Sequence, residues 1–125
     1  MAKDRKQGKR GLNIIIVGCG KVGASLTEQL YKEGHDITLV DRSSERLQAL
    51  TDMYDVMGIV GNGASYKIQR EAGIDNADLM IAVTDSDELN LLCCTVAKRV
   101  GDCAAIARVR TPDYSDEVSY LKEKL

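Results

Sequence analysis

A glycine-rich segment that directly follows an apolar, β-branched run constrains the fold of this chain more than any other feature. The run occupies residues 12–17, and Gly18, Gly20 and Gly23 follow it with the spacing G-x-G-x-x-G. In a strand–loop–helix unit, the first glycine allows a tight turn, and the second lets a pyrophosphate approach the backbone. The third lets the helix pack closely on the strand. The segment therefore predicts a phosphate-binding loop at a helix N-terminus; the alternative is a glycine-rich turn that serves packing alone.

Apolar runs alternate with helical patterns along the rest of the chain. Strands are expected at residues 12–17, 36–40, 55–60, 77–83 and 104–109, with a helix after each. Strict alternation is typical of β-α-β units and a parallel sheet. With right-handed crossovers it predicts an α/β, Rossmann-like, doubly wound sheet of strand order 3-2-1-4-5, in three layers.

Capping signals place the first three helices. Gly34 is expected to end the first helix in a left-handed conformation, and Ser43 or Ser44 is expected to cap the second. A short third helix is expected over about residues 65–72, after a break in the chain that contains two glycines.

The last two helices have start signals of their own. Asp85 and Glu88 have capping-box spacing and are expected to open a long helix that ends at Gly101. Its expected core-facing stripe is Leu89, Leu92, Cys93, Val96 and Val100. Pro112 favours the first position of a last helix that reaches the C-terminus. That helix has an apolar stripe that either contacts a second subunit or packs in the core: Tyr114, Val118, Leu121 and Leu125.

Length and charge limit the domain count and the partners. The 125 residues suffice for one domain, which we expect over residues 12–125, after a basic and disordered arm at residues 1–11. Residues 1–10 carry five of the 17 basic residues and one of the 19 acidic residues, so the rest of the chain is acidic. Because phosphate neutralisation supplies most of the affinity for nucleic acid, an acidic body argues against such a partner.

The apolar runs and the cysteines indicate in which cellular compartment the protein resides. No apolar run approaches the roughly 20 residues that span a bilayer, and no apolar stretch of a secretory signal follows the basic start. The four cysteines form no C-x-x-C pair, so we expect no metal site and a reduced chain with cysteines in its core. These features predict a cytoplasmic protein.

Asp41 follows the second expected strand and is the candidate ribose ligand. It lies 23 positions after Gly18, close to the spacing of a carboxylate that binds ribose hydroxyls. A carboxylate there repels a 2′-phosphate, which favours NAD(H) or an adenine nucleotide over NADP(H), although the neighbouring Arg42 keeps NADP(H) open. Alternatively, Asp41 caps the next helix.

Two further loops end at the same edge of the expected sheet. Asn62, Gly63 and Ala64 follow the third strand and could border the adenine or ribose, the alternative being an ordinary turn whose glycines have positive φ. Thr84 and Asp85 follow the fourth strand, where Asp85 could cap the helix, contact the ligand, or do both.

Basic and nucleophilic side chains near these loops add candidate contacts. Lys21 could bring a positive charge to a phosphate. Arg108 and Arg110 are expected on one face of the fifth strand, where they either reach phosphates or form surface salt bridges. Cys19 suggests a redox-sensing thiol, because a helix N-terminus lowers a thiol pKa, but any residue type fits that position. His35 is expected in a surface turn without a catalytic role.

In combination, these motifs resemble one family. The blocks are IIIVGCGKVGASL, HDITLVDRSSERL, GIVGNGAS, AGIDNADLMIAVTDSDELN and IARVRTPDY, and they run from about Asn13 to the C-terminus. The chain resembles the RCK/KTN (TrkA N-terminal) nucleotide-binding domain of bacterial Trk and Ktr potassium-uptake regulatory proteins. The resemblance implies a set of nucleotide-binding positions: Gly18, Gly20, Lys21, Val22, Asp41, Arg42, Asn62, Gly63, Ala64, Thr84, Asp85, Glu88 and Arg108.

The resemblance also implies a regulatory activity. Such domains bind NAD(H), ATP or ADP without consuming it, and ligand exchange shifts a homodimer or higher assembly of lobes. That assembly gates a membrane potassium transporter or channel subunit at the inner face of the cell membrane. Full regulatory subunits commonly carry a second, C-terminal lobe, so this sequence is either an excised lobe or a natural single-lobe protein. The basic arm is not part of the family pattern.

An oxidoreductase is the alternative from a different class. Hydride transfer needs a substrate site and a positioned acid or base. The five strands and their helices leave no residues for a substrate domain. We therefore expect a protein that is not an enzyme, the alternatives being the cofactor-binding half of an NAD-dependent oxidoreductase or an unrelated nucleotide or S-adenosylmethionine binder.

Overall fold

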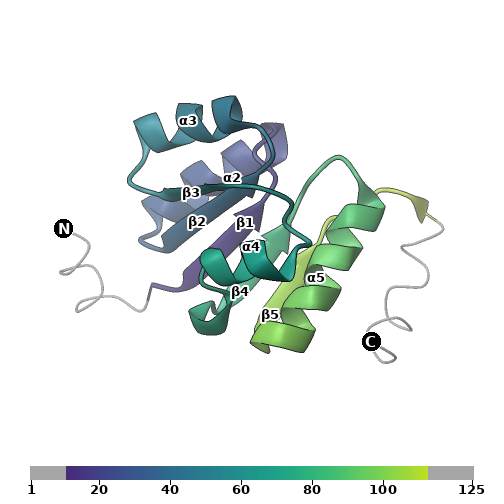
Figure 1. Ribbon diagram of the computed structural model, residues 1–125. Helices are drawn as coiled ribbons and strands as arrows, with labels where there is room; N and C mark the ends of the chain where they lie inside the picture. The colour runs from purple at the N-terminus through teal and green to yellow at the C-terminus, as the bar shows by residue number, and fades with distance from the viewer. Residues whose placement is uncertain (1–10, 113–125) are drawn as a thin grey trace.

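A five-stranded parallel sheet forms the middle layer of the computed structural model, which describes residues 11–112 (Figure 1). Its strands are β1 (Asn13–Val17), β2 (Asp36–Asp41), β3 (Met57–Val60), β4 (Leu79–Ala82) and β5 (Ala104–Ala107). The order is β3-β2-β1-β4-β5, and every neighbouring pair is parallel. This confirms the predicted strand order.

Helices cover both faces of the sheet (Figure 1). They are α2 (Lys21–Lys32), α3 (Ser44–Met53), α4 (Tyr66–Glu71), the 3-10 turn η1 (Ile74–Asn76) and α5 (Asp87–Gly101). Two buried clusters separate the layers: Ile14, Ile16, Leu39, Leu47 and Leu50 lie on the side of α2 and α3. Ile15, Val17, Met80, Cys93 and Ala97 lie on the side of α4 and α5. The predicted three-layer architecture is therefore confirmed.

The central strand β1 is apolar at successive positions because both of its faces are buried. Ile14 and Ile16 belong to one cluster, and Ile15 and Val17 belong to the other. A strand covered on both sides has no polar alternation, and its β-branched residues fit the pleated surface. The glycine loop therefore starts from the most buried strand of the sheet.

Several expected boundaries are wrong by a few residues. β3 begins at Met57 and β4 covers only Leu79–Ala82, and β5 ends at Ala107 rather than at residue 109. The N–H of Arg108 still donates to the carbonyl oxygen of Ala82 in β4 at 2.9 Å, and from there on the backbone pairs with side chains of α5, as described below. The last expected helix with its apolar stripe, and residues 1–10 of the basic arm, lie outside the described residues.

The start of α5 differs from its expectation. Ser86 is the N-cap, and its side-chain oxygen accepts a hydrogen bond from the N–H of Leu89 at 3.1 Å, so Asp85 is not the cap. Ser43, one of the two candidates, caps α3 by accepting from Arg46 N–H. A serine hydroxyl reaches the third following N–H as readily as a carboxylate does, so sequence alone does not separate neighbouring capping residues.

The buried face of α5 is also rotated from the expected one. Leu92, expected in the core, is 52% exposed, and Val100 is also exposed. Cys93 is buried as expected, and the other buried residues of the helix are small or polar: Asp87, Asn90, Cys94 and Ala97. Small residues let the helix approach β4 and β5 closely, and the two polar residues have hydrogen-bond partners on neighbouring strand ends.

Candidate functional site

A crevice of about 660 Å³ opens at the carboxyl ends of the strands. Predicted residues that line it are Gly18, Gly20, Lys21, Val22, Asp41, Arg42, Gly63, Thr84, Asp85 and Arg108. Gly23, Asn62 and Ala64 do not line it, although each lies in or next to one of its loops. In open, doubly wound sheets this end is where ligands bind, at the point where the strand order reverses. Here the reversal falls between β1 and β4.

Two glycines of the loop are required by the fold itself. Gly18 has φ +107°, and a Cβ there would lie 2.9 Å from the backbone of Val83 and Thr84. A Cβ on Gly23 would overlap the carbonyl oxygen of Gly18. These positions therefore need glycine whether or not a ligand binds.

Gly20 is different, because the chain around it leaves room for a side chain. Its backbone is extended, with φ −76° and ψ −159°, and it is the N-cap of α2 without a side-chain cap. A Cβ there would meet one atom, the Nη1 of Arg46, at 3.8 Å, which is ordinary van der Waals contact. The open space above Gly20 therefore belongs to the crevice and not to the packing of the protein.

Asp41, at the end of β2, is hydrogen-bonded to the glycine loop. Its Oδ2 accepts a hydrogen bond from the N–H of Cys19 at 2.7 Å, and its Oδ1 accepts one from the N–H of Ser43 at 2.7 Å. Each carboxylate oxygen retains a lone pair for a ligand hydroxyl. The alternative in which Asp41 caps the next helix is wrong, because Ser43 is the N-cap.

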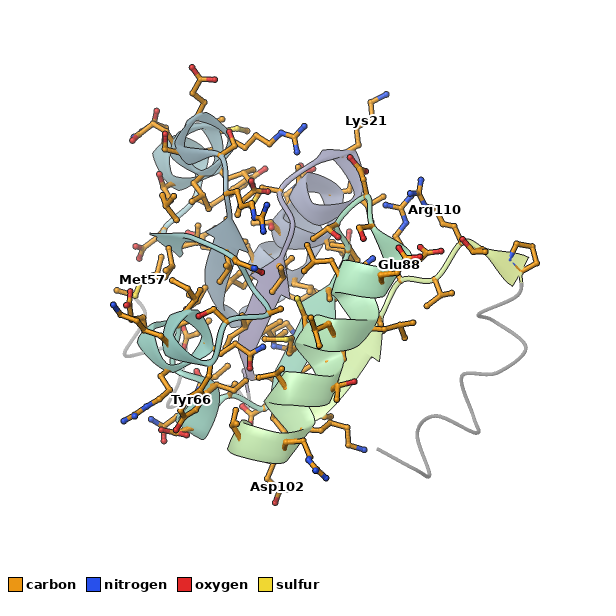
Figure 2. All side chains as sticks on the ribbon, turned by 45° about the vertical axis from the view of Figure 1, so that its right-hand side comes forward. Lys21, Met57, Tyr66, Glu88, Asp102 and Arg110 are labelled. Carbon is orange, nitrogen blue, oxygen red and sulfur yellow. The ribbon has the colours of Figure 1, made fainter. Side chains whose placement is uncertain are left out.

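Positive charge surrounds the loop. Lys21, Arg42, Arg46 and Arg108 line the crevice, against the two carboxylates of Asp41 and Asp85. Figure 2 shows Lys21 at the start of α2 with its side chain extending outward from the body of the protein. The excess of cations at a helix N-terminus favours an anionic ligand. Sequence reasoning missed Arg46; its signal is a basic residue in the first turn of α3.

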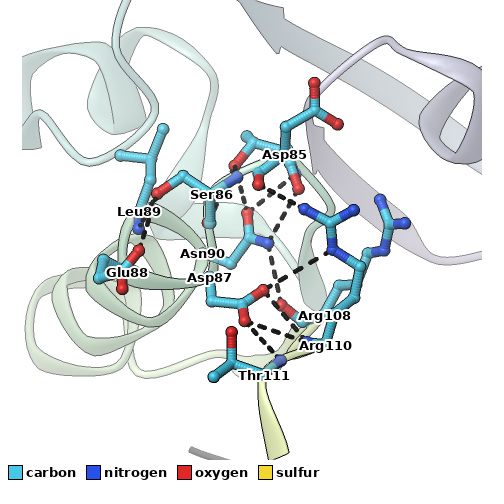
Figure 3. Close-up of polar contacts among 10 residues, drawn as sticks. Asp85, Ser86, Asp87, Glu88, Leu89, Asn90, Arg108, Arg110 and Thr111 are labelled. Carbon is cyan, nitrogen blue, oxygen red and sulfur yellow. Dashed lines mark hydrogen bonds and ion pairs between the residues drawn. The ribbon is translucent and has the colours of Figure 1, made fainter.

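Arg110 does not join this group. Its Nη2 donates to the carbonyl oxygen of Asp85 at 2.6 Å, and its Nε lies 4.0 Å from Oδ1 of Asp87, so the salt-bridge alternative holds for Arg110 (Figure 3). The expected strand boundary is wrong, because β5 ends at Ala107, before both arginines, but the side chains of Arg108 and Arg110 still extend to the same side, as Figure 3 shows.

Asn90 forms hydrogen bonds with two segments that border the crevice, one at Thr84 and one at Arg108 (Figure 3). It is fully buried, and its Oδ1 accepts from the N–H of Thr84 at 2.8 Å and from the Thr84 hydroxyl at 2.7 Å. Its Nδ2 donates to the carbonyl oxygens of Thr84 at 3.1 Å and Arg108 at 2.9 Å. Sequence reasoning missed this residue, because the expected core-facing stripe of the helix did not include it.

Asp87 forms hydrogen bonds with the backbone that follows Arg108. Its carboxylate accepts from the backbone N–H groups of Arg110 and, at 2.7 Å, of Thr111. Hydrogen bonds from the Thr111 side chain and then from these backbone groups lower the pKa of Asp87 below its usual value. The first turn of α5 therefore fixes the chain from Arg108 to Thr111 next to the crevice.

The loop after β3 is positioned by buried polar contacts. Asn62 Oδ1 accepts from the N–H of Ala64 at 2.9 Å, and Gln69 Nε2 donates to the carbonyl oxygens of Gly63 at 2.8 Å and Cys93 at 3.0 Å. A Cβ on Gly63 would overlap Val17. The expected positive-φ glycines are absent from this loop, so that alternative is wrong: glycine at residue 63 serves close packing.

Cys19 lies in an environment that disfavours the thiolate. Its side chain is buried, and burial followed by the nearby Asp41 carboxylate raises its pKa to about 12. A redox-sensing thiol needs a lowered pKa, so the burial and the raised pKa of Cys19 argue against the redox-sensor hypothesis. The other three cysteines are also buried, which confirms their expected place in the core.

We expect the folded protein to resist alkylation. Burial raises the pKa of Cys93 to about 12 and that of Cys94 to about 11, and it also raises the pKa of Cys103. At about pH 8, iodoacetamide should therefore label none of the four cysteines within minutes, whereas all should react in guanidinium chloride, as mass spectrometry would show. The raised pKa values also make stability fall as the pH rises above about 8.5, where unfolded thiols ionise. Rapid labelling of Cys19 in the native protein would contradict this prediction.

The remaining candidates lie away from the crevice. His35 is half-buried in the turn after α2, and its Nδ1 accepts from the N–H of Leu12 at 2.9 Å, a structural contact. Within residues 11–112, no group of three or more histidine, cysteine, aspartate or glutamate residues could hold a metal ion. In the same part of the chain, no helix has the length and apolar character needed to cross a bilayer.

The family model that matches and the curated relatives point to the same family. The family described as TrkA-N domain matches residues 14–123. The chain is 43% identical over 115 residues to the "Trk system potassium uptake protein TrkA" of Haemophilus influenzae, a match that covers 91% of this chain and 24% of the relative. The chain thus spans about a quarter of the length of curated relatives that it matches.

Solved structures share the fold. One is the Kef CTD of Shewanella denitrificans in an AMP-bound form, with a TM-score of 0.78 and 19% identity, covering 88% of this chain and 67% of that one. Another is a GsuK channel bound to NAD, with a TM-score of 0.76 and 18% identity, covering 88% of this chain and 20% of that one.

Proposed function

Because the chain belongs to the TrkA-N domain family, we propose that its crevice binds NAD(H) or an adenine nucleotide such as ATP or ADP, as the sensor of a potassium-uptake system. The ligand is bound and released without being converted. Relatives carry the name of a potassium uptake protein rather than of an enzyme. Two structures of the same fold are described with AMP and with NAD bound.

The observation that carries this proposal is the open space over Gly20. The fold explains the glycines at residues 18 and 23, yet a Cβ at residue 20 would meet only the tip of a flexible arginine. A glycine that packing does not require, at the N-cap of a helix and in a cation-lined crevice, suits the close approach of a pyrophosphate.

The proposal gives the ligand one orientation in the crevice. Phosphates meet the first N–H groups of α2, while the ribose hydroxyls donate to Asp41 at the end of β2. The adenosine then extends toward the loop that contains Gly63, and Arg108 lies on the opposite wall. The carboxylate of Asp41 disfavours a ribose 2′-phosphate, so NADP(H) is the weaker ligand.

Regulation follows if two assembly states bind the nucleotide with different affinities, because a ligand with equal affinity for both states shifts nothing. We propose that the domain works as a homodimer or larger assembly at the inner face of the cell membrane. There it gates a membrane potassium transporter or channel subunit. These steps concern longer proteins such as the curated relatives, of whose length this chain spans about a quarter.

A calorimetric titration with NAD, NADH, ATP, ADP, AMP and NADPH tests the proposal. Asp41→Ala should weaken adenine nucleotides about 30-fold, because it removes the ribose acceptor and releases the N–H of Cys19. Asp52→Ala is the matched control, since Asp52 is exposed on α3 and does not line the crevice. Unchanged affinity of Asp41→Ala would remove Asp41 from the site. Steady NADH turnover with a small carbonyl substrate would favour an oxidoreductase instead.

A further inference from the structure

Arg46 reaches from α3 to the glycine loop. Its backbone N–H donates to the Oγ of Ser43 at 3.2 Å, which places it in the first turn of the helix. Its Nη1 lies 3.8 Å from the position that a Cβ would take on Gly20. A guanidinium from the outer helical layer is therefore next to the backbone that the phosphates of a bound nucleotide would approach.

The stability of α3 does not account for this arginine. A cation in the first turn opposes the positive end of the helix macrodipole, where an acidic residue such as Glu45 is favourable. Among the described residues, no carboxylate forms a salt bridge with the guanidinium of Arg46. An anion from outside the chain would offset both features.

We propose that Arg46 binds a phosphate of the nucleotide, opposite the N–H groups of α2. This inference rests on the proposed function. The planar guanidinium presents two parallel donors that match phosphate oxygens, and such charge-assisted contacts are stronger than neutral hydrogen bonds. Arg46 thereby makes the crevice favour phosphorylated nucleosides over adenosine itself.

The position of Arg46 assigns it to the phosphate end rather than to the ribose. The ribose end is defined by the carboxylate of Asp41, whose two oxygens hold Cys19 and Ser43 through their N–H groups. Arg46 lies instead beside Gly20, the residue that leaves the helix N-terminus accessible. A ligand that spans both positions carries at least one phosphate on its 5′ side.

Titration of adenosine, AMP, ADP and NAD into wild type, Arg46→Ala and Arg46→Lys tests this assignment. Arg46→Ala should weaken ADP and NAD about tenfold and leave adenosine within about twofold. Arg46→Lys should recover part of the loss, because lysine restores the charge but not the paired donors. Arg99→Ala is the control, since Arg99 is exposed in the last turn of α5, outside the crevice.

Each outcome has a defined consequence. Equal weakening of adenosine and ADP by Arg46→Ala would show a structural role and overturn the assignment, as would unchanged affinity for ADP and NAD. In both cases wild-type binding would leave the proposed function intact. A wild-type protein that binds none of the four ligands would overturn the proposed function and the role of Arg46 with it.

Discussion

Gly20→Ala should weaken the binding of NAD or ADP by at least about 100-fold and leave the folded protein at least as stable as wild type. Without ligand, the added methyl group meets only Nη1 of Arg46 at 3.8 Å, and the extended backbone of residue 20 accepts alanine without strain. Alanine also restricts the unfolded chain more than glycine does. With ligand, the same methyl group takes the space that the pyrophosphate needs.

Calorimetric titration and thermal unfolding by circular dichroism measure the two halves of this prediction. Gly23→Ala is the informative comparison, because its Cβ would overlap the carbonyl oxygen of Gly18. It should destabilise the protein by more than about 3 kcal/mol, through strain rather than through a lost ligand contact. If Gly20→Ala bound nucleotide as wild type does, the space over residue 20 would not be a phosphate site. Unfolding of Gly20→Ala would show that the fold needs this glycine after all.

The strand order and the position of the glycine loop could be predicted because they depend on local patterns. A β-branched run such as residues 12–17 followed by glycines specifies a strand and a turn without knowledge of distant residues. Right-handed crossovers then fix the order of neighbouring strands. The carboxyl ends of parallel strands lie at one edge, so Gly18, Asp41 and Thr84 had to meet there.

The burial of α5 could not be predicted, because it depends on tertiary contacts. Leu92 has the more apolar side chain, yet it is exposed while Asn90 is fully buried. The reason is that Asn90 forms hydrogen bonds with backbone groups of Thr84, after β4, and of Arg108, after β5, and only the folded sheet brings these two segments together. A hydrophobicity pattern ranks side chains by polarity and does not register these partners.

Asn90→Ala should lower the free energy of unfolding by about 3 kcal/mol, which corresponds to a fall in the unfolding midpoint on the order of 10 °C. Alanine preserves the helix but leaves the N–H of Thr84 and the carbonyl oxygen of Arg108 without their buried partner. Unsatisfied buried polar groups cost more than the net value of the hydrogen bonds that they formed. Urea unfolding followed by circular dichroism measures the change.

Two further variants separate the hydrogen bonds from helix propensity and from burial. Lys98→Ala changes an exposed residue of the same helix and should stay within about 0.5 kcal/mol of wild type. Asn90→Asp retains oxygen acceptors for Thr84 but loses the donor to Arg108 and adds a buried charge, so it should be destabilised at neutral pH and partly recover in mild acid. A stable Asn90→Ala protein would mean that the segments after β4 and β5 hold their positions without the amide. Nucleotide affinity should fall with stability in Asn90→Ala, because the crevice walls at Thr84 and Arg108 share this single buried side chain.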